Sequence, residues 1–160
     1  MTPIIFLDID GVLNCSALNM SKEMFNAIND VGTRYGRLSS SRIKNLNSLI
    51  SDTGAEIVLS STWRSSENVN GVLYDAGING KIVSHTPFLR EEGSLRGNEI
   101  YVWIQKHIAY QQRDNFKYVI IDDDSDMLYW QRNNFLLCDR ECGLSQDIAY
   151  KAARILNGIY

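Results

Sequence analysis

Two carboxylates stand one residue apart directly after the first apolar run of the chain. The run Ile4–Leu7 is followed by Asp8, Ile9, Asp10 and Gly11. Since side chains alternate along a strand, Asp8 and Asp10 are expected to project the same way from its end. Neighbouring carboxylates repel each other, and a shared proton or a bound cation relieves that repulsion. Hard oxygen ligands of this kind suit Mg2+, although Asp and Gly together are also typical of an ordinary polar turn.

Polar side chains also follow two later apolar runs. The run Ala55–Leu59 is followed by Ser60 and Ser61, and the run Tyr118–Ile121 is followed by a cluster of acids. If parallel strands carry these runs, their carboxyl ends meet at one sheet edge, where open α/β sheets bind ligands. The expected metal ligands are then five carboxylates: Asp8, Asp10, Asp122, Asp123 and Asp126.

This set of groups suits phosphoryl transfer. Asp8 can attack phosphorus and form an aspartyl-phosphate, and a divalent cation lets the two anions approach each other. Asp10 can protonate the leaving oxygen and then activate the water that hydrolyses the intermediate. Ser60 can donate a hydrogen bond to a phosphoryl oxygen, and a fixed cation would offset the charge on the remaining oxygens.

The elements that must position these groups alternate between strands and helices. Apolar runs predict the strands, and apolar residues at helical spacing predict the helices. The predicted strands cover residues 3–8, 55–59, 81–84, 118–121 and 135–138, and the predicted helices cover 22–29, 41–53, 67–76, 96–111, 125–132 and 144–156. This alternation is typical of an α/β fold with a mostly parallel sheet and helices on both faces. We expect a single domain over residues 1–160.

At these residues the chain resembles the haloacid dehalogenase (HAD) phosphohydrolase superfamily. The first motif of that superfamily, D-x-D-G-[VT], is similar to residues 8–12, and the second, an apolar strand ending in Ser or Thr, to residues 57–60. The third motif, a Lys or Arg before the fourth strand, corresponds to Arg96, with Lys81 as the alternative. The fourth is an acidic pair, here at 122–123. The resemblance implies a five-stranded Rossmann-like core, an aspartyl-phosphate mechanism and Mg2+.

A closer resemblance concerns residues 95–108 and 118–131. These segments are similar to HAD domains of RNA and DNA repair proteins, including the 3′-phosphatase half of polynucleotide kinase-phosphatases. The resemblance implies a DNA or RNA 3′ end as the substrate. Only a short segment separates the first motif from the next helix, so a minimal cap or none is expected. A site without a lid is open to a large substrate.

Several residues near the inferred active edge are candidates for contact with the substrate. Arg64 is either a phosphate clamp or a solvated arginine at a helix start. His85 follows the third strand and could reach the rim of the site, and Trp63 could stack on a base, although packing is the favoured role. The predicted substrate-binding residues are Ser61, Arg64, His85 and Arg90.

Composition narrows the function classes. The net charge of −3 argues against a protein that coats nucleic acid over its whole surface. The three cysteines fit no zinc pattern, so reduced thiols and a cytoplasmic location are expected, and no run is long enough to span a membrane. Three other interpretations stay open: a HAD phosphatase for a nucleotide, sugar phosphate or phosphoprotein, a non-catalytic HAD-fold binding module, and a receiver-like phosphoacceptor domain. The oligomeric state also stays open.

Overall fold

The fold is built on a five-stranded sheet in which every strand is parallel to its neighbours. The computed structural model describes residues 1–14, 38–89 and 93–159. The strand order is β3-β2-β1-β4-β5. The strands are β1 (Ile4–Leu7), β2 (Glu56–Leu59), β3 (Ile82–His85), β4 (Tyr118–Asp122) and β5 (Phe135–Leu137). The predicted α/β class with a five-stranded parallel sheet is confirmed.

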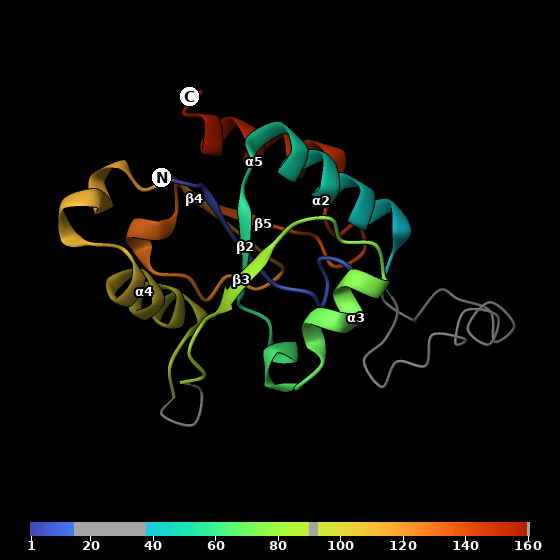
Figure 1. Cartoon of the computed structure of the whole chain (residues 1–160), viewed down its shortest axis with the longest axis horizontal. Coiled ribbons are helices and arrows are strands. Elements are labelled where there is room, and N and C mark those ends of the chain that lie inside the picture. Colours follow the sequence, from blue (N-terminus) through green and yellow to red (C-terminus); the bar gives the residue numbers. More distant parts are fainter. Residues whose placement is uncertain (15–37, 90–92, 160) are drawn as a thin grey trace, which may run out of the picture.

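Helices cover both faces of this sheet (Figure 1). They are α2 (Ser40–Thr53), α3 (Val69–Asp75), α4 (Arg96–His107) and α5 (Gln146–Asn157). α2 and α5 pack against each other on one face, and α4 lies on the other. α4 is shorter than predicted because the chain passes into a separate 3-10 helix, Tyr110–Asn115. The helix expected over 22–29 lies outside the described residues.

The alternation of side chains along the strands decides which polar groups reach the site. On β1, Phe6 packs on the α4 side and Leu7 on the side of α2 and α5. Asp8 therefore follows Phe6 on the α4 side. On β4, Ile120 also packs toward α4, so Asp122, two residues later, projects to the same side of the sheet. Burial of the apolar residues thus places both acids on the face where α4 begins.

β1 and β4 are neighbours in the sheet although a long stretch of chain separates them. The chain runs outward from β1 through β2 to β3, and then returns to place β4 on the other side of β1. Where connections leave in opposite directions, a crevice opens at the carboxyl ends of the strands, and α/β proteins bind ligands there. Asp8 follows β1 and Asp122 ends β4, so both stand at this crevice.

The helix predicted over 125–132 does not form. Only a 3-10 turn, Tyr129–Gln131, is present there. The preceding segment instead bonds the start of α4. Asp126 accepts from the Arg96 N–H through Oδ2 (3.0 Å) and from the Gly97 N–H through its backbone oxygen (3.2 Å). These N–H groups are the unpaired donors of a helix start. The segment therefore caps α4 and does not form an α-helix itself.

The region between β2 and α4 contains no separate cap domain among the described residues. It forms a 3-10 turn, Thr62–Ser65, followed by α3, β3 and connecting loops. The segment 15–37, which follows the first motif, lies outside the described residues. None of the described helices has the length and apolar character that a membrane span needs.

Candidate active site

Three carboxylates from the ends of β1 and β4 form a tight cluster. Leu7 pairs with Ile121 in the parallel ladder, so Asp8 and Asp122 follow at the same level. Ligand oxygens of Asp8, Asp122 and Asp123 all lie within 4.8 Å of one another. This spacing allows one small cation to contact all three side chains.

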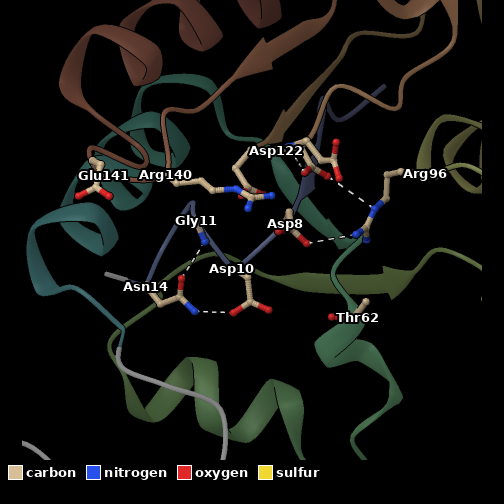
Figure 2. Close-up of a pocket in the computed structure, with 11 residues that line it drawn as sticks. Asp8, Asp10, Gly11, Asn14, Thr62, Arg96, Asp122, Arg140 and Glu141 are labelled. Carbon is tan, nitrogen blue, oxygen red and sulfur yellow. Dashed lines mark hydrogen bonds and ion pairs between the residues drawn. The ribbon is translucent and has the colours of Figure 1, made fainter. Parts of the chain in front are cut away.

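The cluster lines a pocket of about 470 Å³ (Figure 2). Six carboxylates and two guanidinium groups line it, which gives the pocket a formal charge of −4. Such a pocket repels a phosphate group unless cations or protons offset part of the charge. The lining residues are Asp8, Asp10, Gly11, Asn14, Thr62, Arg96, Asp122, Asp123, Asp124, Arg140 and Glu141.

Burial makes the two inner carboxylates hard to ionise. Desolvation raises the pKa of Asp8 to about 6, although the charge of Arg96 and a hydrogen bond from the Ser61 side chain oppose the shift. Desolvation, and then the charge of Asp8, raise the pKa of Asp122 to about 7. Without a cation, the pair therefore retains a proton up to near neutral pH.

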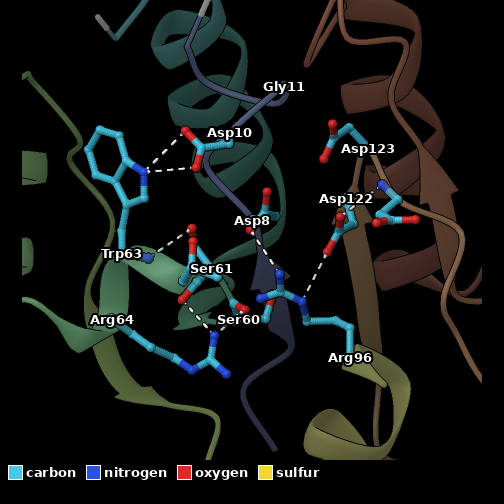
Figure 3. A network of polar contacts seen from close by, with 12 residues as sticks. Asp8, Asp10, Gly11, Ser60, Ser61, Trp63, Arg64, Arg96, Asp122 and Asp123 are labelled. Carbon is cyan, nitrogen blue, oxygen red and sulfur yellow. Dashed lines mark hydrogen bonds and ion pairs between the residues drawn. The ribbon is translucent and has the colours of Figure 1, made fainter. Parts of the chain in front are cut away.

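Arg96, the first residue of α4, lies between these two carboxylates (Figure 3). Its Nη2 is 3.6 Å from Asp8 Oδ1, and its Nε is 3.6 Å from Asp122 Oδ2. Each of the three side chains is at most 5% exposed. Within the described part of the chain, Arg96 Nε, Arg96 Nη1, Asp122 Oδ2 and Ser60 Oγ are buried without a hydrogen-bond partner. Buried polar groups are normally paired, so these atoms leave hydrogen-bonding capacity for a ligand.

Asp10 lies in the turn after β1 and is exposed. The Trp63 indole N–H donates to both of its oxygens, at 3.1 and 3.0 Å, and the Asn14 amide donates to Oδ1 at 2.5 Å. Gly11 has a φ of 70°, and a side chain there would overlap the Asp123 carboxylate. Asp10 was predicted as a metal ligand, but the structure leaves its carboxylate out of the acid cluster.

Asp126, the fifth predicted metal ligand, is also outside the acid cluster. Its Oδ2 accepts the Arg96 backbone N–H at 3.0 Å. The prediction placed Asp126 one helical turn after Asp122, but no helix forms over this segment. The side chain therefore turns to the start of α4, where it holds the backbone of Arg96.

Arg64 is 8% exposed and does not line the pocket. Its guanidinium forms an ion pair with Glu99 of α4 at 2.6 Å and donates to the backbone oxygens of Ser60 and Ser61, both at 2.6 Å. It also donates to two backbone oxygens in the loop after β3. Arg64 thus fastens the loop after β2 to α4. The burial of Arg64 contradicts the interpretation as a solvated arginine, and the phosphate clamp stays a prediction.

The other predicted substrate contacts have separate surroundings. Ser61 accepts the Trp63 backbone N–H at 3.3 Å, and its side chain also hydrogen-bonds Asp8. His85 contacts Asn70 at 3.0 Å and does not line the pocket. Burial, and then the nearby charge of Arg64, lower the pKa of His85. Arg90 lies outside the described residues.

Residues 4–149 match the sequence profile of one protein family, described as the HAD domain in Swiss Army Knife RNA repair proteins. The chain belongs to this HAD family. No curated protein and no solved structure matches it. The predicted resemblance to HAD domains of nucleic-acid repair proteins is therefore confirmed, and it covers nearly the whole chain.

The acid cluster of this HAD domain fits a divalent metal ion. Asp8, Asp122 and Asp123 offer the hard oxygen ligands that Mg2+ prefers. Asp122 Oδ2 is buried and has no hydrogen-bond partner among the described residues. The formal charge of −4 in the pocket also favours a cation. The donor set, its spacing and its charge are therefore all compatible with the magnesium site that HAD proteins generally use.

Six residues that line the pocket of the HAD domain were not predicted as site residues: Gly11, Asn14, Thr62, Asp124, Arg140 and Glu141. Arg140 is 70% exposed, and its Nε lies 2.5 Å from Asp123 Oδ2. It follows β5, whose carboxyl end reaches the same sheet edge, so the argument that pointed to Asp122 would also have found it. Asn14 donates to Asp10 and accepts the Gly11 N–H at 2.8 Å. Its place within one turn of the first motif was the available signal.

Proposed function

We propose that this HAD domain is a Mg2+-dependent phosphomonoester hydrolase that acts through an aspartyl-phosphate on Asp8. The observation that carries the proposal is the set of buried, unpaired donors beside Asp8. Among the described residues, Arg96 Nε, Arg96 Nη1 and Ser60 Oγ lack a hydrogen-bond partner. Leaving buried donors unpaired is costly, and the oxygens of a phosphoryl group would supply the acceptors.

The first half of the reaction forms the covalent intermediate. An Asp8 carboxylate oxygen attacks phosphorus, and the bond between phosphorus and the leaving oxygen breaks. Asp10, at the exposed rim of the pocket, gives a proton to that leaving oxygen. Arg96 keeps a positive charge beside the phosphoryl group throughout. Mg2+ bound by Asp8, Asp122 and Asp123 would supply the charge that lets a carboxylate approach a phosphate.

The second half regenerates the enzyme. Asp10 takes a proton from a water molecule, and the oxygen of that water attacks phosphorus. The bond between phosphorus and the Asp8 oxygen breaks, and inorganic phosphate leaves. Ser60 can donate to a phosphoryl oxygen in both halves, because its hydroxyl at the end of β2 has no hydrogen-bond partner among the described residues. One water molecule is consumed, and both carboxylates return to their initial states.

The substrate that we propose is a 3′-phosphate at the end of an RNA or DNA strand. The family is described by its occurrence in RNA repair proteins. The rim of the pocket carries the exposed Asp10 and the largely exposed Arg140, and the described residues between β2 and α4 form no cap domain. A polymer can reach such a rim, and its further phosphates can contact a surface arginine.

Phosphate release from a panel of substrates tests this proposal. The panel contains 3′- and 5′-phosphorylated RNA and DNA oligonucleotides, nucleoside monophosphates, sugar phosphates and a phosphopeptide, each with Mg2+ and with chelator. We expect turnover only with the metal, a preference for 3′-phosphorylated ends, and no turnover by Asp8→Asn. Preference for a small ester or the phosphopeptide would reject the polynucleotide substrate. A folded protein that hydrolyses nothing in the panel would support the non-catalytic binding module.

A further inference from the structure

Trp63 contacts the carboxylate of Asp10 through its indole nitrogen. The indole Nε1 lies 3.1 Å from Oδ1 and 3.0 Å from Oδ2 of Asp10, so one N–H donates to both oxygens (Figure 3). Trp63 is 5% exposed, whereas Asp10 is exposed at the rim of the pocket. The indole thus reaches from a packed position to a carboxylate at the exposed rim of the pocket. Packing explains the burial of the ring, but packing alone gives no reason for this contact.

The backbone that carries Trp63 is anchored on both sides. The Ser61 side chain accepts the Trp63 backbone N–H at 3.3 Å and also hydrogen-bonds Asp8. Arg64, the next residue, is held by Glu99 at 2.6 Å, and both side chains of this ion pair are at most 3% exposed. The turn Thr62–Ser65 therefore has little room to move. It presents the indole N–H from a fixed place, while Ser61 reaches the nucleophile candidate.

We propose that Trp63 is a positioning residue that orients the Asp10 carboxylate toward the leaving oxygen. The Asn14 amide holds the same carboxylate through Oδ1, so two donors restrict its rotation. The inference rests on the proposed hydrolase function, because the orientation of Asp10 affects the rate only if a leaving group needs its proton. A misoriented catalytic group commonly costs up to about a hundredfold in rate.

Trp63→Phe tests the inference because it keeps the aromatic ring and removes the N–H donor. We expect kcat/KM to fall about tenfold to a hundredfold for an alkyl or 3′-nucleotide phosphate, whose leaving group needs protonation. For 4-nitrophenyl phosphate, which needs little protonation, we expect a loss of less than about threefold. A loss of equal size on both substrates would overturn the proposal, because it would indicate a structural effect.

Trp103→Phe is a matched control. Trp103 is also 5% exposed, and its indole N–H donates to the Ser84 hydroxyl at 3.0 Å, away from the residues that line the pocket. Its replacement should change both substrates by the same small factor. In an Asp10→Asn background, Trp63→Phe should cause no further selective loss on the poor leaving group. A further selective loss there would show that Trp63 acts through another residue.

A measurement on the intact tryptophan applies if Trp63→Phe does not fold. The chain has three tryptophans, so each indole N–H can be followed by NMR. In Asp10→Ala, the Trp63 indole resonance should shift and its proton should exchange faster, whereas the Trp103 resonance should not change. An unaltered Trp63 resonance would reject the contact. Failure of the wild-type protein on every ester would reject the hydrolase function instead, and the positioning role with it.

Discussion

Two arginines flank the acid cluster, and one of them is buried whereas the other is exposed. Arg96 is 5% exposed and lies 3.6 Å from carboxylates that end two different strands. Arg140 is 70% exposed and, among the described residues, forms an ion pair with Asp123 at 2.5 Å. A guanidinium packed among strands stays where the fold puts it, whereas exposed ion pairs are weak and readily exchange partners. Arg96 therefore suits the phosphoryl group that is common to all substrates, and Arg140 suits parts of the substrate that vary.

The strongest test of this comparison is the removal of the buried charge. Arg96→Met should lower kcat about a hundredfold to a thousandfold, as loss of one preorganised donor does in other enzymes. Arg96→Lys should recover part of the loss, because it keeps the charge but not the planar fork. The measurement is single-turnover phosphate release, with circular dichroism to check the fold. A loss below tenfold would remove Arg96 from the role of fixed cation.

A second test concerns the buried carboxylates beside Arg96. The pKa of Asp122 is raised to about 7, so the folded protein holds this proton at pH values where the unfolded chain has already lost it. The free energy of unfolding of the metal-free protein should therefore fall as the pH rises from about 4 to about 7. Asp122→Asn should remove much of that fall and make the metal-free protein more stable at pH 8, on the order of 2 kcal/mol.

Urea denaturation in chelator, at pH 5 and pH 8, measures this difference. Added Mg2+ should stabilise the wild-type protein at pH 8, because the ion binds the ionised carboxylates, and it should stabilise Asp122→Asn much less. Asp52→Asn is a control for charge alone, because it removes the same negative charge from an exposed side chain of α2. A wild-type protein whose stability rises between pH 5 and pH 8 without metal would contradict the argument.

The smallest effect should come from the exposed arginine. Arg140→Ala should raise KM for a 3′-phosphorylated oligonucleotide about tenfold and leave kcat nearly unchanged. KM for 4-nitrophenyl phosphate should change little, because this ester has no further phosphate to contact Arg140. Steady-state kinetics at two salt concentrations should also show a weaker salt dependence of the oligonucleotide KM in the variant. Equal effects on both substrates would place Arg140 at the transferred phosphate, beside Arg96.

The strands and the acids at their ends could be predicted from the sequence because both depend on local chemistry. Apolar runs must be buried, and parallel strands bring their carboxyl ends together, so Asp8, Asp122 and Asp123 could be found without the structure. The predictions for Arg64 and Asp126 depended on where long or loop-borne side chains turn. Arg64 forms an ion pair with Glu99, and Asp126 accepts a backbone N–H at the start of α4. Neither partner is near in sequence.

The contact of Trp63 with Asp10 could not be predicted from the sequence either, because the two partners are distant in sequence. The two residues are 53 positions apart, and an aromatic residue after a strand is ordinarily part of the core. Only the turn geometry after β2 shows that its indole nitrogen meets a carboxylate. Positions of this kind need the tertiary arrangement, because the residue type alone indicates packing.

The ion pair between Arg64 and Glu99 couples the turn after β2 to the start of α4. Arg64 lies in the turn Thr62–Ser65, directly after Trp63, and Glu99 lies one helical turn beyond Arg96. Breaking one side of such a buried pair is strongly destabilising, so the turn after β2 and the start of α4 should open as a single unit. Hydrogen exchange should then report one opening rate for both segments, and heating should release the contacts of Trp63 and of Arg96 at the same temperature.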